Sequence, residues 1–167
     1  MLGGKRERTM KSYSTHLVGI LAVAVIVTAG CSRKPETLTN KYDEKKMEQA
    51  IVDARATFDE FVARFHSPQP GDTAFNVKVK IEDEHGIEHF WVGDLMLDAE
   101  PFSGKIGNEP GVVKKVKFGQ AYTFARSDVS DWMYISNGKM QGNYTLRVEL
   151  ESMPRKEADA LKKKIGW

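Results

Sequence analysis

The sequence predicts an α+β fold: a curved, mostly antiparallel sheet of about five or six strands, packed by one long N-terminal helix and followed by a short C-terminal helix. Two observations predict this class. Apolar residues recur every three or four positions over Asp43–His66, which is the period of a helix. From Thr73 onward apolar and polar residues alternate, as in a strand with one buried face. The change of period places a helix before a sheet.

The helix predicted over Asp43–His66 has one apolar side, which we expect to pack on the core; a groove for a partner helix is the alternative. Asp43 and Glu44 suit the positive N-terminal end of a helix, and Ser67–Gly71, with two prolines, ends it. The apolar side consists of Met47, Ile51, Ala54, Phe58, Phe61 and Phe65.

Alternating segments predict the first four strands. The first strand begins at Thr73 and turns at Asp83–Gly86, and the second runs over Ile87–Leu97. Shorter strands are predicted at Phe102–Ile106 and Gln120–Phe124, with a loop containing glycine and proline between them.

A hairpin and a helix are predicted to close the chain. The dipeptide Asn137-Gly138 favours a two-residue type I′ turn, and alternation over Met140–Leu150 predicts a long strand after it. Such a turn pairs residues whose numbers sum to 275, so Met133 faces Gly142 on the side assigned as apolar. Met153–Lys164 is predicted to be a short basic helix.

The two hairpins assign three large aromatic side chains to the other side of the sheet. Trp132 and Tyr134 fall opposite polar residues across the Asn137-Gly138 turn. If the loop of the first hairpin has an even number of residues, Val92 joins Val77 on the apolar side and Trp91 falls with Lys78. Three arrangements stay open for this second face: the long helix covers it, the aromatics form a partly open surface for a ligand or protein, or a bulge near Gly93 breaks the alternation.

Residues 1–30 have the pattern of a lipoprotein signal peptide. Leu17–Ala29 is an uncharged apolar run after a basic stretch, too short for a membrane span of about 20 residues. It ends in Val27-Thr28-Ala29-Gly30-Cys31, which resembles the bacterial lipobox. Cys31 is therefore predicted to become the lipidated first residue, with 31–42 as a tether and 43–167 as a single domain. An uncleaved anchor or a buried cysteine is the alternative.

These features predict a protein of the cell envelope, anchored to membrane lipid through Cys31. Ser32 follows the cysteine where Asp would resemble an inner-membrane retention signal, so in a double-membraned bacterium we expect the periplasmic face of the outer membrane. Of 25 basic and 23 acidic residues, four and one lie in 1–30, which leaves 21 and 22. The near-neutral remainder argues against a nucleic-acid partner.

Few residues of the sequence suggest a catalytic, metal-binding or cofactor-binding role. Cys31 is the only cysteine, and no zinc, calcium or nucleotide-binding motif occurs, so neither a metal nor a cofactor is expected. Asp131 with Glu109 or Asp128 could act as an acid–base pair. Aspartates next to serines more often bond nearby backbone amides in turns, which is the interpretation we favour.

Seven stretches together resemble the YegJ-like domain of unknown function, DUF2314, over about Met47 to Val148. They are Glu88-His89-Phe90-Trp91-Val92, Phe102-Ser103-Gly104, Asn108-Glu109-Pro110, Val116-Lys117-Phe118-Gly119, Ser130-Asp131-Trp132-Met133-Tyr134, Asn137-Gly138-Lys139 and Gly142-Asn143-Tyr144-Thr145. Members of this family usually carry Met where Phe90 stands and Gly where Asn143 stands. The resemblance implies a shared domain and brings no established activity.

The leading hypothesis is a membrane-tethered, non-enzymatic module that binds an envelope protein or a small ligand. An envelope hydrolase using Asp131 with Glu109 or Asp128 is one alternative, and an immunity-like protein against an envelope toxin is another. The candidate binding surface consists of Trp91, Trp132, Tyr134, Asp131, Asn108 and Glu109.

Overall fold

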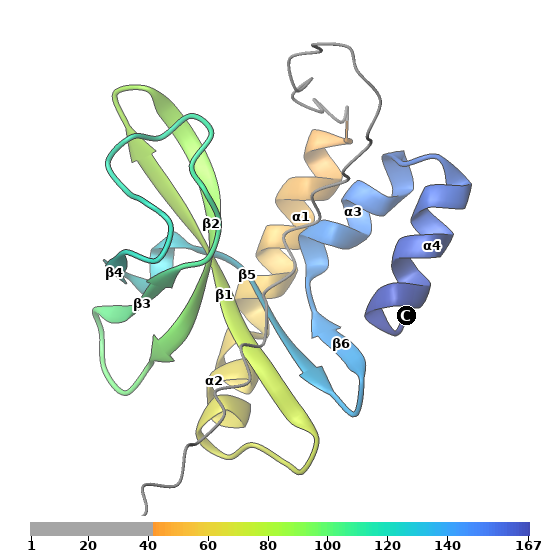
Figure 1. The fold of residues 1–167 in the computed structure, drawn as a ribbon, viewed down its shortest axis with the longest axis horizontal. Coiled ribbons are helices and arrows are strands. Elements are labelled where there is room, and N and C mark those ends of the chain that lie inside the picture. Colours follow the sequence, from red (N-terminus) through yellow and green to blue (C-terminus); the bar gives the residue numbers. More distant parts are fainter. Residues whose placement is uncertain (1–41) are drawn as a thin grey trace, which may run out of the picture. The chain divides into compact units, whose positions relative to one another are not determined.

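The structure is a computed structural model that describes residues 42–167. Cys31, the predicted signal peptide and nearly all of the predicted tether lie outside this range. Six strands form one antiparallel sheet in the order β4-β3-β2-β1-β5-β6 (Figure 1). They are β1 (Asp72–Asp83), β2 (Gly86–Met96), β3 (Phe102–Ile106), β4 (Ala121–Phe124), β5 (Val129–Ser136) and β6 (Lys139–Gly142).

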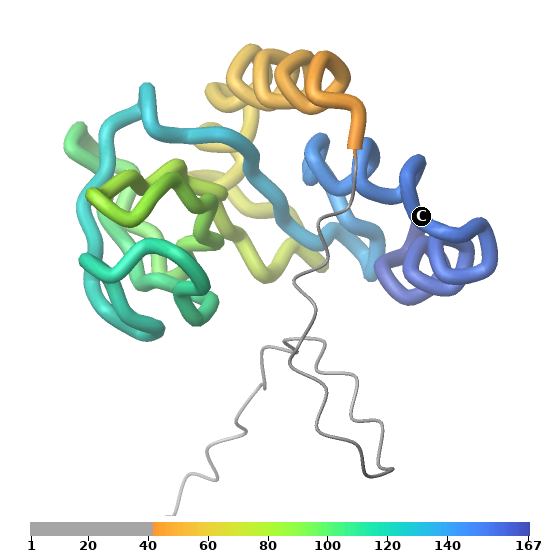
Figure 2. The backbone as a smooth tube through the Cα atoms, turned by 90° about the horizontal axis from the view of Figure 1, so that it is seen from above, coloured from red at the N-terminus to blue at the C-terminus, as the bar shows by residue number. Residues whose placement is uncertain are grey.

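Two helices precede the sheet and two follow it, so the fold is α+β with an open antiparallel sheet. The helices are α1 (Glu44–Ala56), α2 (Phe58–His66), α3 (Tyr144–Ser152) and α4 (Arg155–Ile165), with a 3₁₀ turn, η1 (Arg126–Asp128), before β5. None of the helices in 42–167 combines the length and the apolar character that a membrane crossing needs. Figure 2 shows α1 on one side of the sheet and α3 and α4 together at the β6 end.

The single N-terminal helix of the prediction is two helices, because the chain breaks at Thr57. This residue leaves helical geometry (φ −103°, ψ 7°), and its hydroxyl lies 3.0 Å from the Asp53 carbonyl and 3.2 Å from the Ala54 carbonyl. The Trp132 indole donates to the Ala54 carbonyl at 2.9 Å. Both contacts use an acceptor that a continuous helix would need. The apolar side of the prediction is confirmed, with Phe58 and Phe61 buried in the core.

Both predicted hairpins have the predicted register. Val77 faces Val92 across β1 and β2, and Met133 faces Gly142 across β5 and β6. Both residues of Asn137-Gly138 have positive φ, 50° and 77°, as a type I′ turn requires.

The strand predicted over Met140–Leu150 is wrong beyond Gly142. β6 ends there, Asn143 adopts the left-handed conformation (φ 53°, ψ 51°), and α3 begins at Tyr144. The first amides of α3 donate to the Asp131 carboxylate on β5. This contact joins residues far apart in the sequence, so a local two-residue period cannot report it. The C-terminal helix is confirmed as α4.

One face of the sheet packs against α1 and α2. Trp132 opposes Val77 across β1 and β5, so both side chains point to this face, and Tyr134 follows by alternation. Trp91 opposes Lys78 and points to the other face. The prediction that Trp91, Trp132 and Tyr134 share a face is therefore wrong. The hairpin pairing was sound, but its apolar side was assigned without the β1–β5 register, which a shift next to Lys78 also interrupts.

Candidate functional site

The sheet surface turned away from α1 and α2 carries charged and polar side chains, and we call it the polar face. Its central members come from three adjacent strands. They are Lys78 and Lys80 on β1, His89 and Trp91 on β2, and Asp131 on β5.

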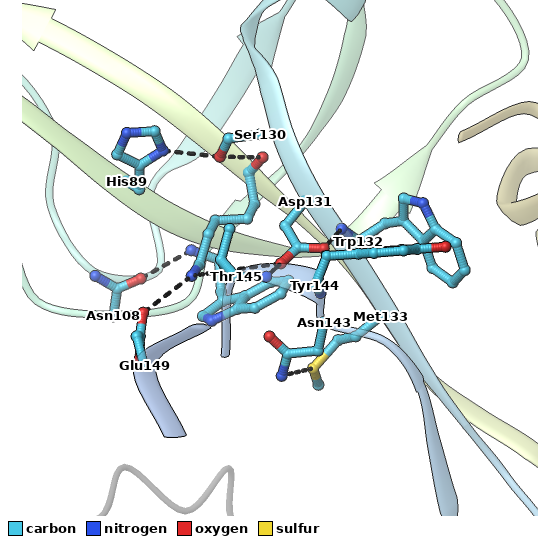
Figure 3. Close-up of polar contacts among 12 residues, drawn as sticks. His89, Asn108, Ser130, Asp131, Trp132, Met133, Asn143, Tyr144, Thr145 and Glu149 are labelled. Carbon is cyan, nitrogen blue, oxygen red and sulfur yellow. Dashed lines mark hydrogen bonds and ion pairs between the residues drawn. The ribbon is translucent and has the colours of Figure 1, made fainter. Parts of the chain in front are cut away.

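Lys78 stands at the centre of the polar face, and its side chain is only 14% exposed. Its ammonium donates to Thr145 Oγ1 at 2.8 Å and lies 4.0 Å from a Glu149 carboxylate oxygen, both on α3 (Figure 3). The same nitrogen lies 5.0 Å from the centre of the Trp91 ring, within cation–π range. Lys78 therefore links the sheet, α3 and the Trp91 indole.

Trp91 is held by a loop that replaces a neighbouring strand. Its amide donates to Asn108 Oδ1 at 2.9 Å, and its carbonyl accepts from the Gly107 amide at 2.7 Å. These two bonds satisfy both backbone groups of Trp91 where β3 no longer pairs with β2. The prediction thus named two residues that the structure brings together, Trp91 and Asn108, while Glu109 is exposed on the same loop.

Asp131 is fully buried, and its carboxylate accepts four hydrogen bonds. One oxygen accepts from the amides of Trp132 and Tyr144 at 2.8 and 3.1 Å. The other accepts from the amide and hydroxyl of Thr145 at 2.8 and 2.7 Å. Asp131 thereby caps the N-terminus of α3, where backbone N–H groups lack helical partners. Its role in the structure is to hold α3 against β5.

His89 has a defined tautomer because Ser130 has only one hydroxyl proton. Ser130 Oγ donates to the Lys78 carbonyl at 3.2 Å, so it accepts from His89 Nδ1 at 2.8 Å. Burial lowers the pKa of His89, and the nearby charges of Lys78, Lys80 and Arg55 lower it further. The imidazole is therefore neutral at pH 7 and offers Nε2 as an acceptor.

Two carboxylates of the β1–β2 hairpin hold the loop after β3 by hydrogen bonds to its backbone amides. Glu88 accepts from the amides of Gly111, Val112 and Val113, at 2.9 to 3.2 Å. Asp83 accepts from the amides of residues 114 and 115 at 2.6 and 3.0 Å. Asp83, Glu84 and His85 place possible metal-ligand atoms within 4.8 Å of one another. Because the Asp83 carboxylate already bonds the loop amides, we assign this cluster a structural role.

The predicted and observed sites overlap in part. Trp132, 7% exposed, belongs to the core, and its ring lies 5.2 Å from that of Phe61. Tyr134 stacks on Phe75 at 5.0 Å on the same face. The sequence analysis did not predict Lys78 as a site residue. The available signal was its position between Val77 and Val79, two buried valines of a central strand. Asp128, which was paired with Asp131 as a candidate, bonds the Ala125 amide at 3.0 Å and caps η1 instead.

This arrangement of sheet and helices is the domain of an uncharacterised bacterial family. Residues 44–167 match the family described as "Uncharacterized protein conserved in bacteria (DUF2314)", and the chain belongs to it. The chain is 38% identical over 147 residues to "Uncharacterized protein YegJ" of Escherichia coli K12, which covers 87% of this chain and 95% of that protein.

A second relative has a different length. It is a protein of Neisseria meningitidis serogroup B, described by its name as a provisional ankyrin repeat protein, and is 33% identical over 76 residues. The match covers 46% of this chain and 30% of that protein. No solved structure matches the chain.

Proposed function

We propose that the chain is a lipid-anchored envelope protein whose domain binds a partner through the polar face. The observation that carries the binding role is the pair formed by Lys78 and Trp91, a nearly buried ammonium 5.0 Å from a partly buried indole. Tryptophans and cations fixed in partly desolvated surroundings are typical of binding hot spots. Hydrogen bonds to neighbouring elements hold both residues before any partner arrives, which lowers the entropy lost on binding.

The structure changes which residues form the proposed surface. Trp91 and Asn108 remain, and Lys78 and His89 join them. Glu109 lies at the rim on the exposed loop. Trp132 and Tyr134 lie on the opposite, helix-covered face, and Asp131 caps α3.

Binding is favoured over hydrolysis because Asp131 has no free lone pair in good geometry. Each of its oxygens accepts two hydrogen bonds, and a general base must accept a further proton from the substrate or water. Immunity toward an envelope toxin remains one form that partner binding could take, and the identity of the captured partner distinguishes it.

The Neisseria relative adds support for an interaction role. A stretch similar to 76 residues of this chain occurs in a protein whose name refers to ankyrin repeats, and stacked repeats of that kind form extended binding surfaces.

The binding role is tested by Trp91→Ala in the full chain, expressed in its own host and treated with a short amine-reactive crosslinker. We expect the parent to give a discrete adduct that Trp91→Ala abolishes at equal protein level. Val52→Ala is the matched control, because Val52 is an apolar side chain 56% exposed on α1, away from the polar face. An adduct that persists in Trp91→Ala contradicts the proposal.

The lipid anchor has a separate test. Blocking the lipoprotein signal peptidase should leave a heavier precursor, and Cys31→Ala should abolish incorporation of radiolabelled palmitate and release the chain from the membrane fraction. Unchanged membrane attachment of Cys31→Ala contradicts the anchor without affecting the binding test.

A further inference from the structure

Two methionines of the β5–β6 hairpin lie against one buried amide. Met133 and Met140 belong to the two paired strands, and both side chains are partly buried. Asn143, 5% exposed, directs its NH₂ group at them, with its nitrogen 3.1 Å from Met140 Sδ and 3.9 Å from Met133 Sδ. Figure 3 shows the contact with the Met133 sulfur. The Asn143 oxygen has no hydrogen-bond partner, so the contacts to sulfur determine which way the amide points.

The two sulfurs differ in how they use this amide. At 3.1 Å the Met140 sulfur is engaged by one N–H group. At 3.9 Å the Met133 sulfur is only weakly engaged, and a thioether is a poor acceptor even at closer range. The second N–H group of Asn143 is therefore a fixed donor without a strong acceptor, and the lone pairs of the Met133 sulfur stay reactive.

We propose that Met133 is a site of reversible oxidation to methionine sulfoxide by a peroxide, and that the Asn143 amide binds the added oxygen. The sulfur donates an electron pair to one peroxide oxygen, the O–O bond breaks and an S–O bond forms. The departing oxygen takes the proton of the transferred oxygen and leaves as water. Sulfoxide reductases return the product to the thioether, which makes the change reversible.

The distances favour Met133 over Met140 as the oxidised residue. With an S–O bond of about 1.5 Å and an N···O distance of about 2.9 Å, the 3.9 Å between the Asn143 nitrogen and Met133 Sδ gives an angle of about 120° at the oxygen. That angle suits an oxygen acceptor. The same lengths with the 3.1 Å at Met140 give roughly 80°, so the Met140 sulfur would have to move away before its oxygen could accept.

The oxidised side chain belongs to the polar face. Met133 opposes Asn76 across β1 and β5 and alternates with Trp132, which points to the helix-covered face. Oxidation usually disrupts a packed methionine because it adds a polar oxygen. Here a fixed donor meets that oxygen, so we expect the oxidised domain to stay folded and the polar face to gain a polar group at its β5–β6 end.

Asn143 can be replaced while its turn is kept. Its backbone is left-handed, φ 53°, a conformation that glycine adopts freely and aspartate tolerates. Asn143→Gly removes the whole amide, and Asn143→Asp keeps its size but removes both N–H donors. The two variants test the donor independently of each other.

The experiment treats the full chain with hydrogen peroxide and maps methionine sulfoxide by mass spectrometry. Trypsin cleaves after Lys139, so Met133 and Met140 fall in separate peptides, and epimer-specific reductases show which sulfoxide each peptide carries. We expect at least about tenfold more oxidation at Met133 than at Met140, and a single epimer at Met133. Met96, 64% exposed, is the control and should carry both epimers.

The Asn143 variants should lose this selectivity. In Asn143→Gly and Asn143→Asp the ratio of Met133 to Met140 oxidation should fall toward one, and Met133 should carry both epimers. In the parent, one side-chain N–H proton of Asn143 should move downfield in the NMR spectrum on oxidation. Equal oxidation of Met133 and Met140 in the parent, both epimers at Met133 there, or an unchanged ratio in a folded Asn143 variant overturns the inference.

Discussion

Trp132 and Trp91 lie on neighbouring parts of one sheet but point to opposite faces. Trp132 packs on Phe61 and donates its indole N–H to the Ala54 carbonyl, so every part of it serves the fold. Trp91 meets the Lys78 ammonium instead, and a loop holds its backbone. The face covered by α1 and α2 therefore stabilises the domain. The polar face instead carries polar groups that the fold holds in place and that can contact a partner.

The largest expected change in stability tests this difference between the two tryptophans. Trp132→Ala should lower the free energy of unfolding by about 3–5 kcal/mol, because it empties a large core volume and removes the indole hydrogen bond to the Ala54 carbonyl. Trp91→Ala should cost about 1 kcal/mol, because its ring is only partly buried. Urea unfolding of the full chain measures both. Equal losses would mean that Trp91 is as structural as Trp132.

The next effect concerns the carboxylate that joins the polar face to α3. Asp131→Asn should cost about 2–3 kcal/mol, because an NH₂ group then opposes an amide that the carboxylate accepted. Asp128→Asn is the control, since Asp128 bonds one amide of η1 and should cost about 1 kcal/mol. An Asp131→Asn protein as stable as the parent would contradict the capping role and reopen a catalytic one.

Acid should weaken two contacts of β1, one with α2 and one with the loop after β3. The Arg64 guanidinium lowers the pKa of Asp72 to about 2. Burial opposes the shift at Asp83, but backbone N–H groups of residues 114, 85 and 115 lower its pKa to about 2 as well. Both values lie below the ordinary 3.8, so the stabilisation is complete above that pH and is lost as the pH falls through about 2.

Urea midpoints measured from about pH 5 to pH 2 should show this loss, and the double variant with Asp72→Asn and Asp83→Asn should show a flatter profile. An identical acid profile in the double variant would assign the loss to other carboxylates.

The smallest effect has the opposite sign. Asn143→Gly should stabilise the domain by about 0.5–1 kcal/mol, because glycine relieves the left-handed backbone and the unpaired oxygen disappears. Asn137→Gly is the control, since Asn137 has a similar φ of 50° but an exposed side chain. A destabilised Asn143→Gly would show that the contacts to the two methionines outweigh both terms.

The sequence allowed local features to be predicted and left distant ones open. An even-numbered turn and an Asn-Gly pair determine register within a hairpin, so Val77 opposite Val92 and Met133 opposite Gly142 were predictable. The face of Trp132 was not, because it depends on how β5 pairs with β1, about 55 residues away in the chain.

Helix α3 shows the same limit in another form. Its sequence alternates like a strand, yet Asp131 on β5 caps its first turn and the chain becomes helical. The same limit applies to the candidate site. Trp91 and Asn108 could be predicted from their own segments of the sequence. Lys78 could not, because its role depends on contacts with Thr145 and Glu149 on α3.

The most direct test of the account places a photo-crosslinking amino acid in the full chain, at one position on each side of the sheet. Lys80 is exposed on the polar face, opposite His89, and Val52 is exposed on α1. Irradiation in the native envelope should give a discrete adduct from position 80 and none from position 52. The same adduct from both positions, or an adduct from position 52 alone, would contradict the claim that the polar face is the binding surface.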